Sequence, residues 1–208
     1  MADIRGLYAI TDPTLIPAER LLVACEAALR GGARLLQYRD KPASPSERRQ
    51  RAASLRDLCR DHGAVLLIND DPELAAEIGA DGVHIGQSDG AIERARQLLG
   101  PTAIIGVTCH GSVDLARHAA EAGANYVAFG RFYPSHTKPG AAAADPAVLA
   151  TLLPLPKVAI GGVTPDNAPA LIAAGAEAVA VIHSLFSAAD IEARARLFAN
   201  LFSPKESS

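Results

Sequence analysis

The feature that most constrains the fold of this chain is its regular alternation of short apolar runs with helical segments. Eight runs have the length and aliphatic composition of strands that are buried on both faces. They lie at Leu7–Ile10, Leu35–Tyr38, Val65–Ile68, Gly82–Ile85, Ala103–Val107, Tyr126–Phe129, Val158–Ile160 and Ala178–Ile182. Helical patterns follow them or lie between them, at Pro17–Arg30, Pro45–His62, Pro72–Ile78, Ala91–Leu99, Ser112–Ala122, Pro146–Leu152, Asp166–Ala173 and Ala189–Phe202. This alternation predicts a parallel sheet that is covered by helices.

The same pattern predicts a single α/β domain, a (β/α)8 TIM barrel, over residues 1–208, with a frayed polar tail from about Ser203. Four helical segments end in a Gly-Ala pair just before the next strand, and glycine at that point is a helix stop. The pairs are Gly32-Ala33, Gly79-Ala80, Gly123-Ala124 and Gly175-Ala176. The rival fold, an open doubly wound sheet, usually has a GxGxxG turn after its first strand, whereas this chain has Ala9-Ile-Thr-Asp12.

The composition of the chain argues against membrane, secreted, zinc-binding and nucleic-acid-binding proteins. No apolar run approaches the roughly 20 residues of a membrane span, and the first residues lack a signal-peptide core, so we expect a cytoplasmic protein with no membrane partner. Three cysteines without CxxC spacing argue against a disulfide framework or a zinc site. The net charge of −3 gives no basis for nucleic-acid binding. An anionic substrate must therefore be bound by local cations. The sequence leaves homo-oligomer formation open.

Two carboxylates close adjacent strands in the middle of the chain. Asn69 and Asp70 end the third apolar run, and Asp89 follows the fourth after one short helical segment. Such a βαβ unit makes the two strands parallel neighbours, so both carboxylates should lie at the same edge of the sheet. Two carboxylates that lie close together repel unless a proton or cation separates them, and hard oxygen ligands suit Mg²⁺. Alternatively, Asp70 and Asp89 only cap the helices that follow.

Residues at the carboxyl ends of the other strands suggest two anion sites, because barrel enzymes place their chemistry at that face. Three cations and three hydroxyls could surround a diphosphate; these are Arg39, Lys41, Lys138, Thr108, Ser135 and Thr137. The second site is Gly161-Gly162 with the backbone after the eighth strand, the usual phosphate-binding corner of this fold. A simple tight turn would also explain the glycine pair. Two such sites in one barrel mouth suggest a diphosphate and a monophosphate substrate.

With these residues in order, the chain resembles the thiamine-phosphate synthase family. The matching motifs cover nearly the whole chain: Tyr8-Ala-Ile-Thr-Asp12, Gln37-Tyr-Arg39-Asp-Lys41, Asn69-Asp70, Gly82-Val-His-Ile-Gly-Gln-Ser-Asp89, Gly106-Val-Thr-Cys-His110, Ser135-His-Thr137-Lys138, Ile160-Gly-Gly162 and Val181-Ile182. The resemblance implies a transferase that joins hydroxymethylpyrimidine diphosphate to a thiazole phosphate, carboxylated or hydroxyethyl, and releases pyrophosphate. The implied partners are therefore small-molecule substrates.

The resemblance also implies roles for individual residues. The diphosphate would be held by Gln37, Arg39, Lys41 and Asn69, and Mg²⁺ would be bound by Asp70 and Asp89. The departing pyrophosphate would be contacted by Thr108 and Lys138. The thiazole phosphate would be faced by Ser135 and Thr137 and surrounded by Gly162, Ile182 and His183. Arg39, Thr108 and Lys138 are then the expected catalytic residues, because catalysis would depend on stabilising the leaving group through a dissociative substitution.

Three positions depart from the family pattern. Thr108 stands where Ser is common and Ser135 where Thr is common, so both hydroxyls are kept. His183 stands where the family usually has Ser, which removes a small donor beside the expected thiazole phosphate. Two alternatives share the barrel but need no diphosphate clamp: a thiazole tautomerase and a non-catalytic barrel that binds thiazole phosphate. The combined presence of Arg39, Lys41 and Lys138 with the two aspartates argues against both.

Overall fold

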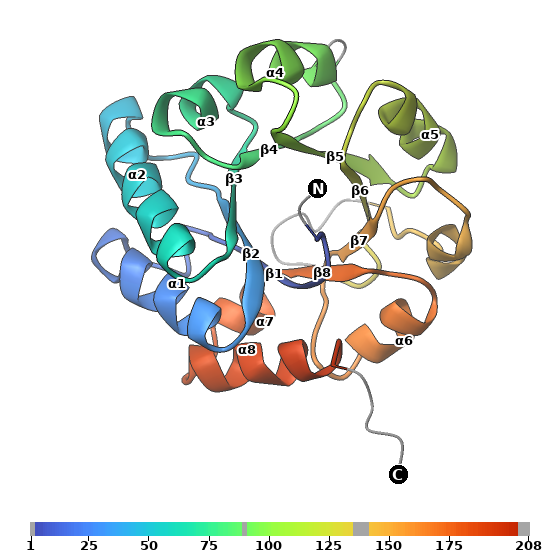
Figure 1. Ribbon diagram of the computed structural model, residues 1–208. Helices are drawn as coiled ribbons and strands as arrows, with labels where there is room; N and C mark the ends of the chain where they lie inside the picture. Colours follow the sequence, from blue (N-terminus) through green and yellow to red (C-terminus); the bar gives the residue numbers. More distant parts are fainter. Residues whose placement is uncertain (1–2, 89–90, 135–141, 204–208) are drawn as a thin grey trace.

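The computed structural model describes residues 3–88, 91–134 and 142–203, and these residues form a closed barrel of eight parallel strands in sequence order (Figure 1). The strands are β1 (Gly6–Ile10), β2 (Ala33–Tyr38), β3 (Val65–Asn69), β4 (Gly82–Ile85), β5 (Ile104–His110), β6 (Tyr126–Phe129), β7 (Lys157–Ile160) and β8 (Ala178–Val181). Parallel pairing of β1 with β8, with Gly6 opposite Ala178, closes the ring. The predicted (β/α)8 barrel is therefore confirmed, and the open doubly wound sheet is excluded.

Helices surround the strands on the outside of the barrel (Figure 1). They are α1 (Leu21–Arg30), α2 (Pro45–Asp61), α3 (Pro72–Ile78), α4 (Ala91–Leu99), α5 (Val113–Glu121), α6 (Ala168–Ala173), α7 (His183–Phe186) and α8 (Ile191–Asn200), with short 3-10 helices η1 (Ala18–Arg20) and η2 (Pro146–Ala150). The structure differs from the predicted helices most clearly in two places. The helix expected at Pro146–Leu152 is the 3-10 turn η2, and α7 was not predicted because four residues are too few to show a helical period.

The four predicted helix stops have the backbone conformation that only glycine adopts easily. Gly79 is left-handed, with φ of 67°, and its N–H bonds to carbonyls of the last turn of α3. Gly32, Gly123 and Gly175 have φ of 101°, 91° and 116°. Each of these glycines turns the chain sharply from a helix into the next strand, which keeps the connections short.

The apolar core has two parts. The larger part lies between the strands and the helices, and the smaller part fills the inside of the barrel. Inside the barrel, aliphatic side chains such as Leu35, Leu67 and Val158 surround two buried phenols, Tyr8 and Tyr126. Burial of side chains this large contributes about 1.5–3 kcal/mol each. The barrel is therefore a packed core and not a pore.

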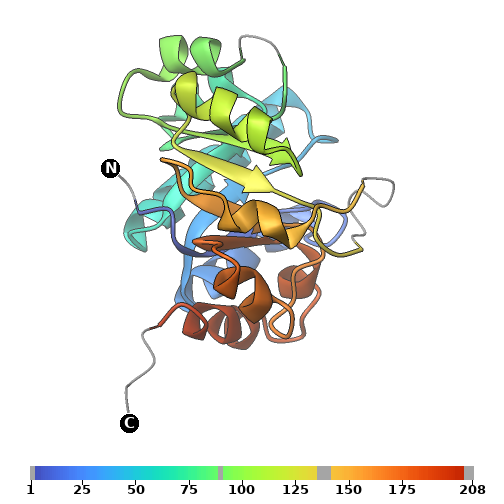
Figure 2. The same cartoon turned by 90° about the vertical axis from the view of Figure 1, so that its right-hand side faces the viewer.

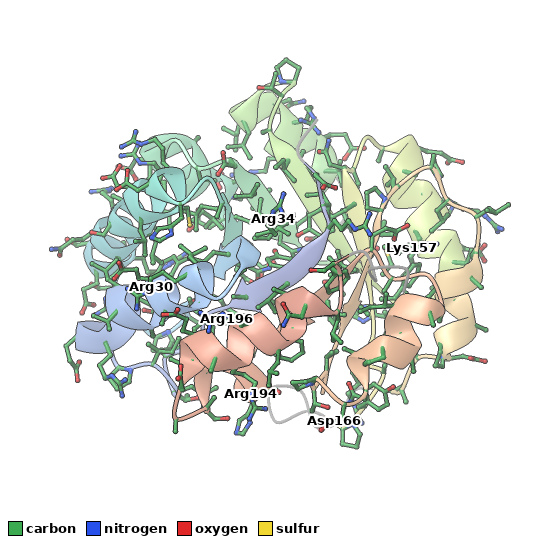
Figure 3. All side chains as sticks on the ribbon, turned by 60° about the horizontal axis from the view of Figure 1, so that its bottom comes forward. Arg30, Arg34, Lys157, Asp166, Arg194 and Arg196 are labelled. Carbon is green, nitrogen blue, oxygen red and sulfur yellow. The ribbon has the colours of Figure 1, made fainter. Side chains whose placement is uncertain are left out.

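The first and last helices pack together and complete the ring of helices. On the surface, Glu192 of α8 pairs with Arg30 Nε of α1 at 3.0 Å and with Arg196 of its own helix at 2.7 Å. Figure 3 labels the two arginines. Gly31 lies under this contact, where a Cβ would come within 2.4 Å of Ala195 Cβ. The absence of a side chain at Gly31 lets the two helices approach closely.

All eight strands point in the same direction, so their carboxyl ends share one face of the barrel; the arrow of β6 points towards it in Figure 2. The opposite face is structural. There Lys157, at the start of β7, is buried and donates from Nζ to the carbonyls of Leu149 at 2.7 Å and Thr151 at 3.2 Å (Figure 3). None of the helices within the described ranges is long and apolar enough to cross a membrane.

Candidate active site

A cavity of about 320 Å³ opens at the carboxyl end of the strands. Its lining includes Gln37 of β2 and Arg39 just after it, Asn69 of β3 and Thr108 of β5. It also includes Gly162 after β7 and His183 after β8. A volume of this size is within the range of small-molecule sites. The structure thus brings most of the described sequence-predicted residues into one cavity.

Arg39 follows β2 and is held in place by two residues that follow β1. The Thr11 hydroxyl accepts a hydrogen bond from the Arg39 amide at 2.8 Å and donates to the Arg39 carbonyl at 3.1 Å. Asp12 lies 3.6 Å from the Arg39 guanidinium, and the Asp12 carboxylate is itself fixed by Thr14. These contacts hold the cation at the cavity wall, where it would meet an anion without first losing much side-chain entropy.

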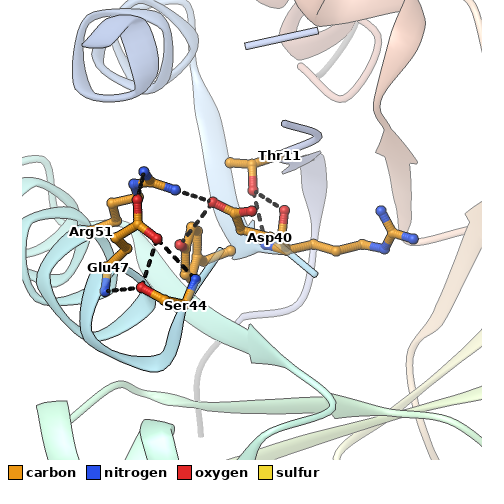
Figure 4. A network of polar contacts seen from close by, with 7 residues as sticks. Thr11, Asp40, Ser44, Glu47 and Arg51 are labelled. Carbon is orange, nitrogen blue, oxygen red and sulfur yellow. Dashed lines mark hydrogen bonds and ion pairs between the residues drawn. The ribbon is translucent and has the colours of Figure 1, made fainter. Parts of the chain in front are cut away.

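A second polar network fixes the loop after β2 (Figure 4). Arg51 of α2 donates to Asp40 at 2.7 Å and pairs with Glu47 at 3.0 Å, and Glu47 forms a capping box with Ser44. Hydrogen bonding to Asp40 is the main cause that raises the pKa of Arg51. The network anchors the segment that carries Lys41.

Lys41 itself does not line the main cavity. It lies with Asn69 and Asp70 at a second pocket of about 360 Å³. Asn69 belongs to both pockets. The alternation of Gln37, Arg39 and Lys41 therefore does not place all three side chains in one cavity, because β2 ends at Tyr38 and strand alternation no longer applies at Lys41.

The helix-capping alternative fails for Asp70. The N-cap of α3 is Asp71, whose carboxylate accepts a hydrogen bond from the amide of Leu74 at 2.9 Å. Asp70 is exposed, has a left-handed φ of 57°, and accepts a hydrogen bond from Asn69 Nδ2 at 2.9 Å. A non-glycine residue in this conformation costs about 1–2 kcal/mol, and such residues gather at functional sites.

Two residues near the carboxyl end of β5, Thr108 and His110, line the cavity. Thr108 Oγ1 lies 2.9 Å from Nε2 of His84, and its carbonyl accepts a hydrogen bond from Gln87 Nε2. His110 is exposed, lines the cavity and, like Asp70, has a positive φ, at 51°. Cys109 between them is buried, and burial raises the pKa of its thiol to about 12. This agrees with a packing role for Cys109.

The glycine pair after β7 is shaped by the loop after β6. A Cβ on Gly161 would come within 2.2 Å of Arg131 Cβ, and one on Gly162 would come within 2.4 Å of the Pro134 carbonyl. Both glycines also have positive φ, at 90° and 67°. The loop after β6 therefore packs directly against the backbone of the predicted phosphate corner.

The corner is completed by residues after β8. Ile182, His183 and Ser184 line the cavity there, at the start of α7. The Ser184 hydroxyl oxygen is buried and has no hydrogen-bond partner in the described part of the chain. A buried hydroxyl left unpaired in this way is costly, and a ligand oxygen would satisfy it.

Four predicted site residues lie outside the described residues: Asp89, Ser135, Thr137 and Lys138. Within residues 3–88, 91–134 and 142–203, no group of three or more His, Cys, Asp or Glu side chains could hold a metal ion. The predictions for these four residues stay predictions.

Two of the polar cavity residues that sequence reasoning missed are Arg131 and Ser184. Arg131 brings a further cation to the cavity beside Gly161, and Ser184 brings the unpaired hydroxyl. Their positions directly after β6 and β8 were the available signal, because every strand end in a barrel faces the mouth. The packing that turns them inward depends on loop conformation, which has no periodic pattern in the sequence.

Arg39, Arg131 and the Gly161-Gly162 pair line the mouth of the closed barrel. This arrangement is typical of (β/α)8 enzymes that act on anionic small molecules. The sequence profile of the thiamine monophosphate synthase family matches residues 7–185. The thiamine-phosphate synthase of Alcanivorax borkumensis is 60% identical over 99% of this chain and 97% of its own length. That of Marinobacter nauticus is 58% identical over 95% and 90%.

A solved structure agrees with these relatives. The thiamine phosphate pyrophosphorylase of Pyrococcus furiosus superposes with a TM-score of 0.86 and 30% identity, over 96% of both chains. This chain therefore belongs to the thiamine monophosphate synthase family. Its activity is that of a transferase of thiamine biosynthesis that forms thiamine phosphate from small-molecule substrates. The tautomerase and non-catalytic alternatives lose their support.

Proposed function

We propose that the cavity performs this synthesis as a dissociative substitution between two anions bound on opposite walls. The proposal rests on the observation that one cavity is lined both by Arg39, Asn69 and Thr108, from β2, β3 and β5, and by the Gly162 corner after β7. The first wall suits the pyrimidine diphosphate, and the second suits the thiazole phosphate. Gln37, which is buried below them, would contact the pyrimidine diphosphate from the floor.

The wall formed by Arg39, Asn69 and Thr108 would act on the leaving group. The C–O bond to the diphosphate breaks, and its electron pair leaves with pyrophosphate. Arg39 and the Thr108 hydroxyl, together with Lys138, would stabilise the charge that grows on the pyrophosphate oxygens. Donors that are fixed in advance, as Arg39 is by Thr11 and Asp12, need no reorganisation during the step.

The opposite wall would hold the nucleophile. The backbone of Gly162, Ile182 and His183 would bind the thiazole phosphate, as would the unpaired Ser184 hydroxyl and the predicted donors Ser135 and Thr137. The ring nitrogen then forms the new C–N bond with its own lone pair, so no general base is needed. Fixing both reactants in one cavity gives the rate advantage of an intramolecular reaction.

Asp70 fits a role in binding Mg²⁺. Its carboxylate is exposed in the pocket shared with Asn69 and Lys41, and the helix-capping function is carried out by Asp71. A hard oxygen donor of this kind suits Mg²⁺, and we propose that Asp70 and Asp89 hold the ion. When bound, Mg²⁺ would neutralise part of the negative charge on the diphosphate.

The test is a pyrophosphate-release assay with both substrates. We expect release with hydroxymethylpyrimidine diphosphate, thiazole phosphate and Mg²⁺, and we expect EDTA to abolish it until excess Mg²⁺ is returned. Asp70→Asn should raise the Mg²⁺ concentration needed for half-maximal rate. Full activity in EDTA, or an unchanged Mg²⁺ requirement in Asp70→Asn, would contradict the metal assignment.

A further inference from the structure

A row of hydrogen-bonded side chains crosses the barrel interior directly below the cavity. It joins five strands, through Gln37 of β2, Tyr8 of β1, Tyr126 of β6, His84 of β4 and Thr108 of β5. Gln37 Nε2 donates to the Tyr8 hydroxyl at 2.6 Å, and the two phenol oxygens are 2.9 Å apart. His84 Nδ1 lies 2.8 Å from the Tyr126 oxygen, and His84 Nε2 lies 2.9 Å from Thr108 Oγ1.

The row is built into the core of the protein. Tyr8 and Tyr126 are 1% and 0% exposed, and desolvation by burial raises the pKa of both phenols, so they stay neutral hydroxyls. The His84 ring stacks on Tyr126 with the centroids 5.6 Å apart. Gly106 makes room for this arrangement, because a Cβ there would lie 1.9 Å from the Tyr126 ring. Packing thus fixes the position of each link.

The donors and acceptors of the row determine where each proton lies. The amide of Gln37 donates to Tyr8, so the Tyr8 hydroxyl must use its own proton elsewhere, and within the described residues its other partner is Tyr126. Tyr126 then accepts from Tyr8 and donates to His84 Nδ1. Hydrogen bonds that run in one direction strengthen one another.

The direction of these hydrogen bonds determines how Thr108 is oriented at the cavity wall. With Nδ1 accepting, neutral His84 carries its proton on Nε2 and donates it to Thr108 Oγ1. Thr108 is thereby an acceptor towards the barrel interior, and its own hydroxyl proton must point away from His84. Thr108 lines the cavity, so that direction is available to a bound anion.

We propose that Tyr8, Tyr126 and His84 are positioning residues that set the Thr108 hydroxyl as a donor to the departing pyrophosphate. This inference rests on the proposed function, which places the diphosphate on the Thr108 wall. The reverse direction of the row would place a proton on His84 Nδ1 and turn the Thr108 hydroxyl proton inward. The two directions therefore predict different His84 tautomers. They also predict different acceptors for the Thr108 hydroxyl proton: a bound anion in the proposed direction, and His84 Nε2 in the reverse direction.

The first test reads the tautomer without any activity. Nitrogen-15 NMR of histidine-labelled protein reports which ring nitrogen carries the proton, and a His84→Gln variant assigns the signals. We expect the Nε2–H tautomer in the substrate-free protein at pH 7–8. A proton on Nδ1, or on both nitrogens, would overturn the proposal.

The second test separates positioning from folding by a double-mutant cycle. We expect Tyr126→Phe to lower kcat for pyrophosphate release by about tenfold while the KM for the diphosphate stays within about twofold. Thr108→Ser should keep near-normal kcat. In a Thr108→Val background, Tyr126→Phe should add no further loss, because its effect passes through the hydroxyl that is already absent.

Tyr133→Phe is the matched control, because the Tyr133 hydroxyl makes no hydrogen bond among the described residues; its kcat should be unchanged. Additive losses in the cycle would overturn the proposal, because they would show that Tyr126 does not act through Thr108. The proposed function fails separately, if the wild-type protein with both substrates and Mg²⁺ releases no pyrophosphate. The tautomer measurement would still stand in that case.

Discussion

The two walls that we propose as anion sites are built by different means. The β2–β3 wall depends on charged side chains held by ion pairs and hydrogen bonds, as Arg39 is held by Asp12 and Thr11. The β7–β8 corner depends on glycine backbone, shaped by the loop that packs against Gly161 and Gly162. The charged side chains of the first wall can stabilise negative charge that increases on the leaving group in the transition state. The backbone of the second wall can only bind a phosphate group of fixed shape. Damage to the first wall should therefore slow the reaction, and damage to the second should weaken binding.

Arg39→Ala should give the largest effect. We expect kcat for pyrophosphate release to fall about 10²–10³-fold, as for loss of one preorganised donor, with the KM of the thiazole phosphate within about twofold. Steady-state kinetics with each substrate varied in turn measures both values. The matched control is Arg49→Ala, an exposed arginine of α2 that pairs with Glu77, which should leave kcat unchanged. A tenfold or greater rise in the KM of the thiazole phosphate would contradict the separation of the two walls into a leaving-group site and a thiazole phosphate site.

Gly162→Ala should act on the opposite wall. The new Cβ would meet the Pro134 carbonyl, so we expect the KM of the thiazole phosphate to rise at least tenfold, with kcat within a few-fold of wild type. Gly63→Ala is the control, because Gly63 has a similar φ of 62° and open space around it. Gly63→Ala should lose about 1–2 kcal/mol of unfolding free energy to the positive φ, measured by urea denaturation, and Gly162→Ala should lose more because of the close contact with Pro134. Equal KM values in the two variants would refute a binding role for the corner.

Ser184→Ala should separate binding from stability. The removed hydroxyl is buried and lacks a partner among the described residues, so the free energy of unfolding should be unchanged or higher by up to about 1 kcal/mol. If the hydroxyl bonds the thiazole phosphate, the KM of that substrate should rise about five- to tenfold. A clear loss of thermal stability with an unchanged KM would show that the serine is structural.

Cys109 should show almost no effect, although it lies beside the cavity. Thiols react as thiolates, and a pKa of about 12 leaves roughly one thiolate in 10⁴ at pH 8. The thiolate fraction grows tenfold for each unit of rising pH, so alkylation by iodoacetamide should be very slow at pH 8 and faster at pH 10. Cys109→Ala should retain wild-type kcat. Rapid loss of activity on alkylation at pH 8 would contradict a packing role.

Much of this molecule could be predicted from its sequence because barrel strands are short, apolar and regularly spaced. β4 (Gly82–Ile85) and β6 (Tyr126–Phe129) were predicted with the bounds that the structure shows. Strand ends also placed Arg39 and Thr108 at the mouth, because parallel strands share one carboxyl face.

The rest depends on contacts that no periodic pattern shows. Lys41 turns into a side pocket because the loop after β2 follows the Asp40–Arg51 ion pair and not the strand alternation. The row through Tyr8, Tyr126 and His84 joins residues 42 to 118 positions apart, and none of the three was predicted to contact another. Such long-range polar contacts are set by the closure of the barrel.

The most direct test of the two-wall account is calorimetric titration of thiazole phosphate into the wild-type protein that is already saturated with Mg²⁺ and pyrophosphate. The account predicts one equivalent of thiazole phosphate bound per chain, with pyrophosphate retained, because the two anions occupy different walls of one cavity. Competition between them, with thiazole phosphate displacing pyrophosphate, would contradict it.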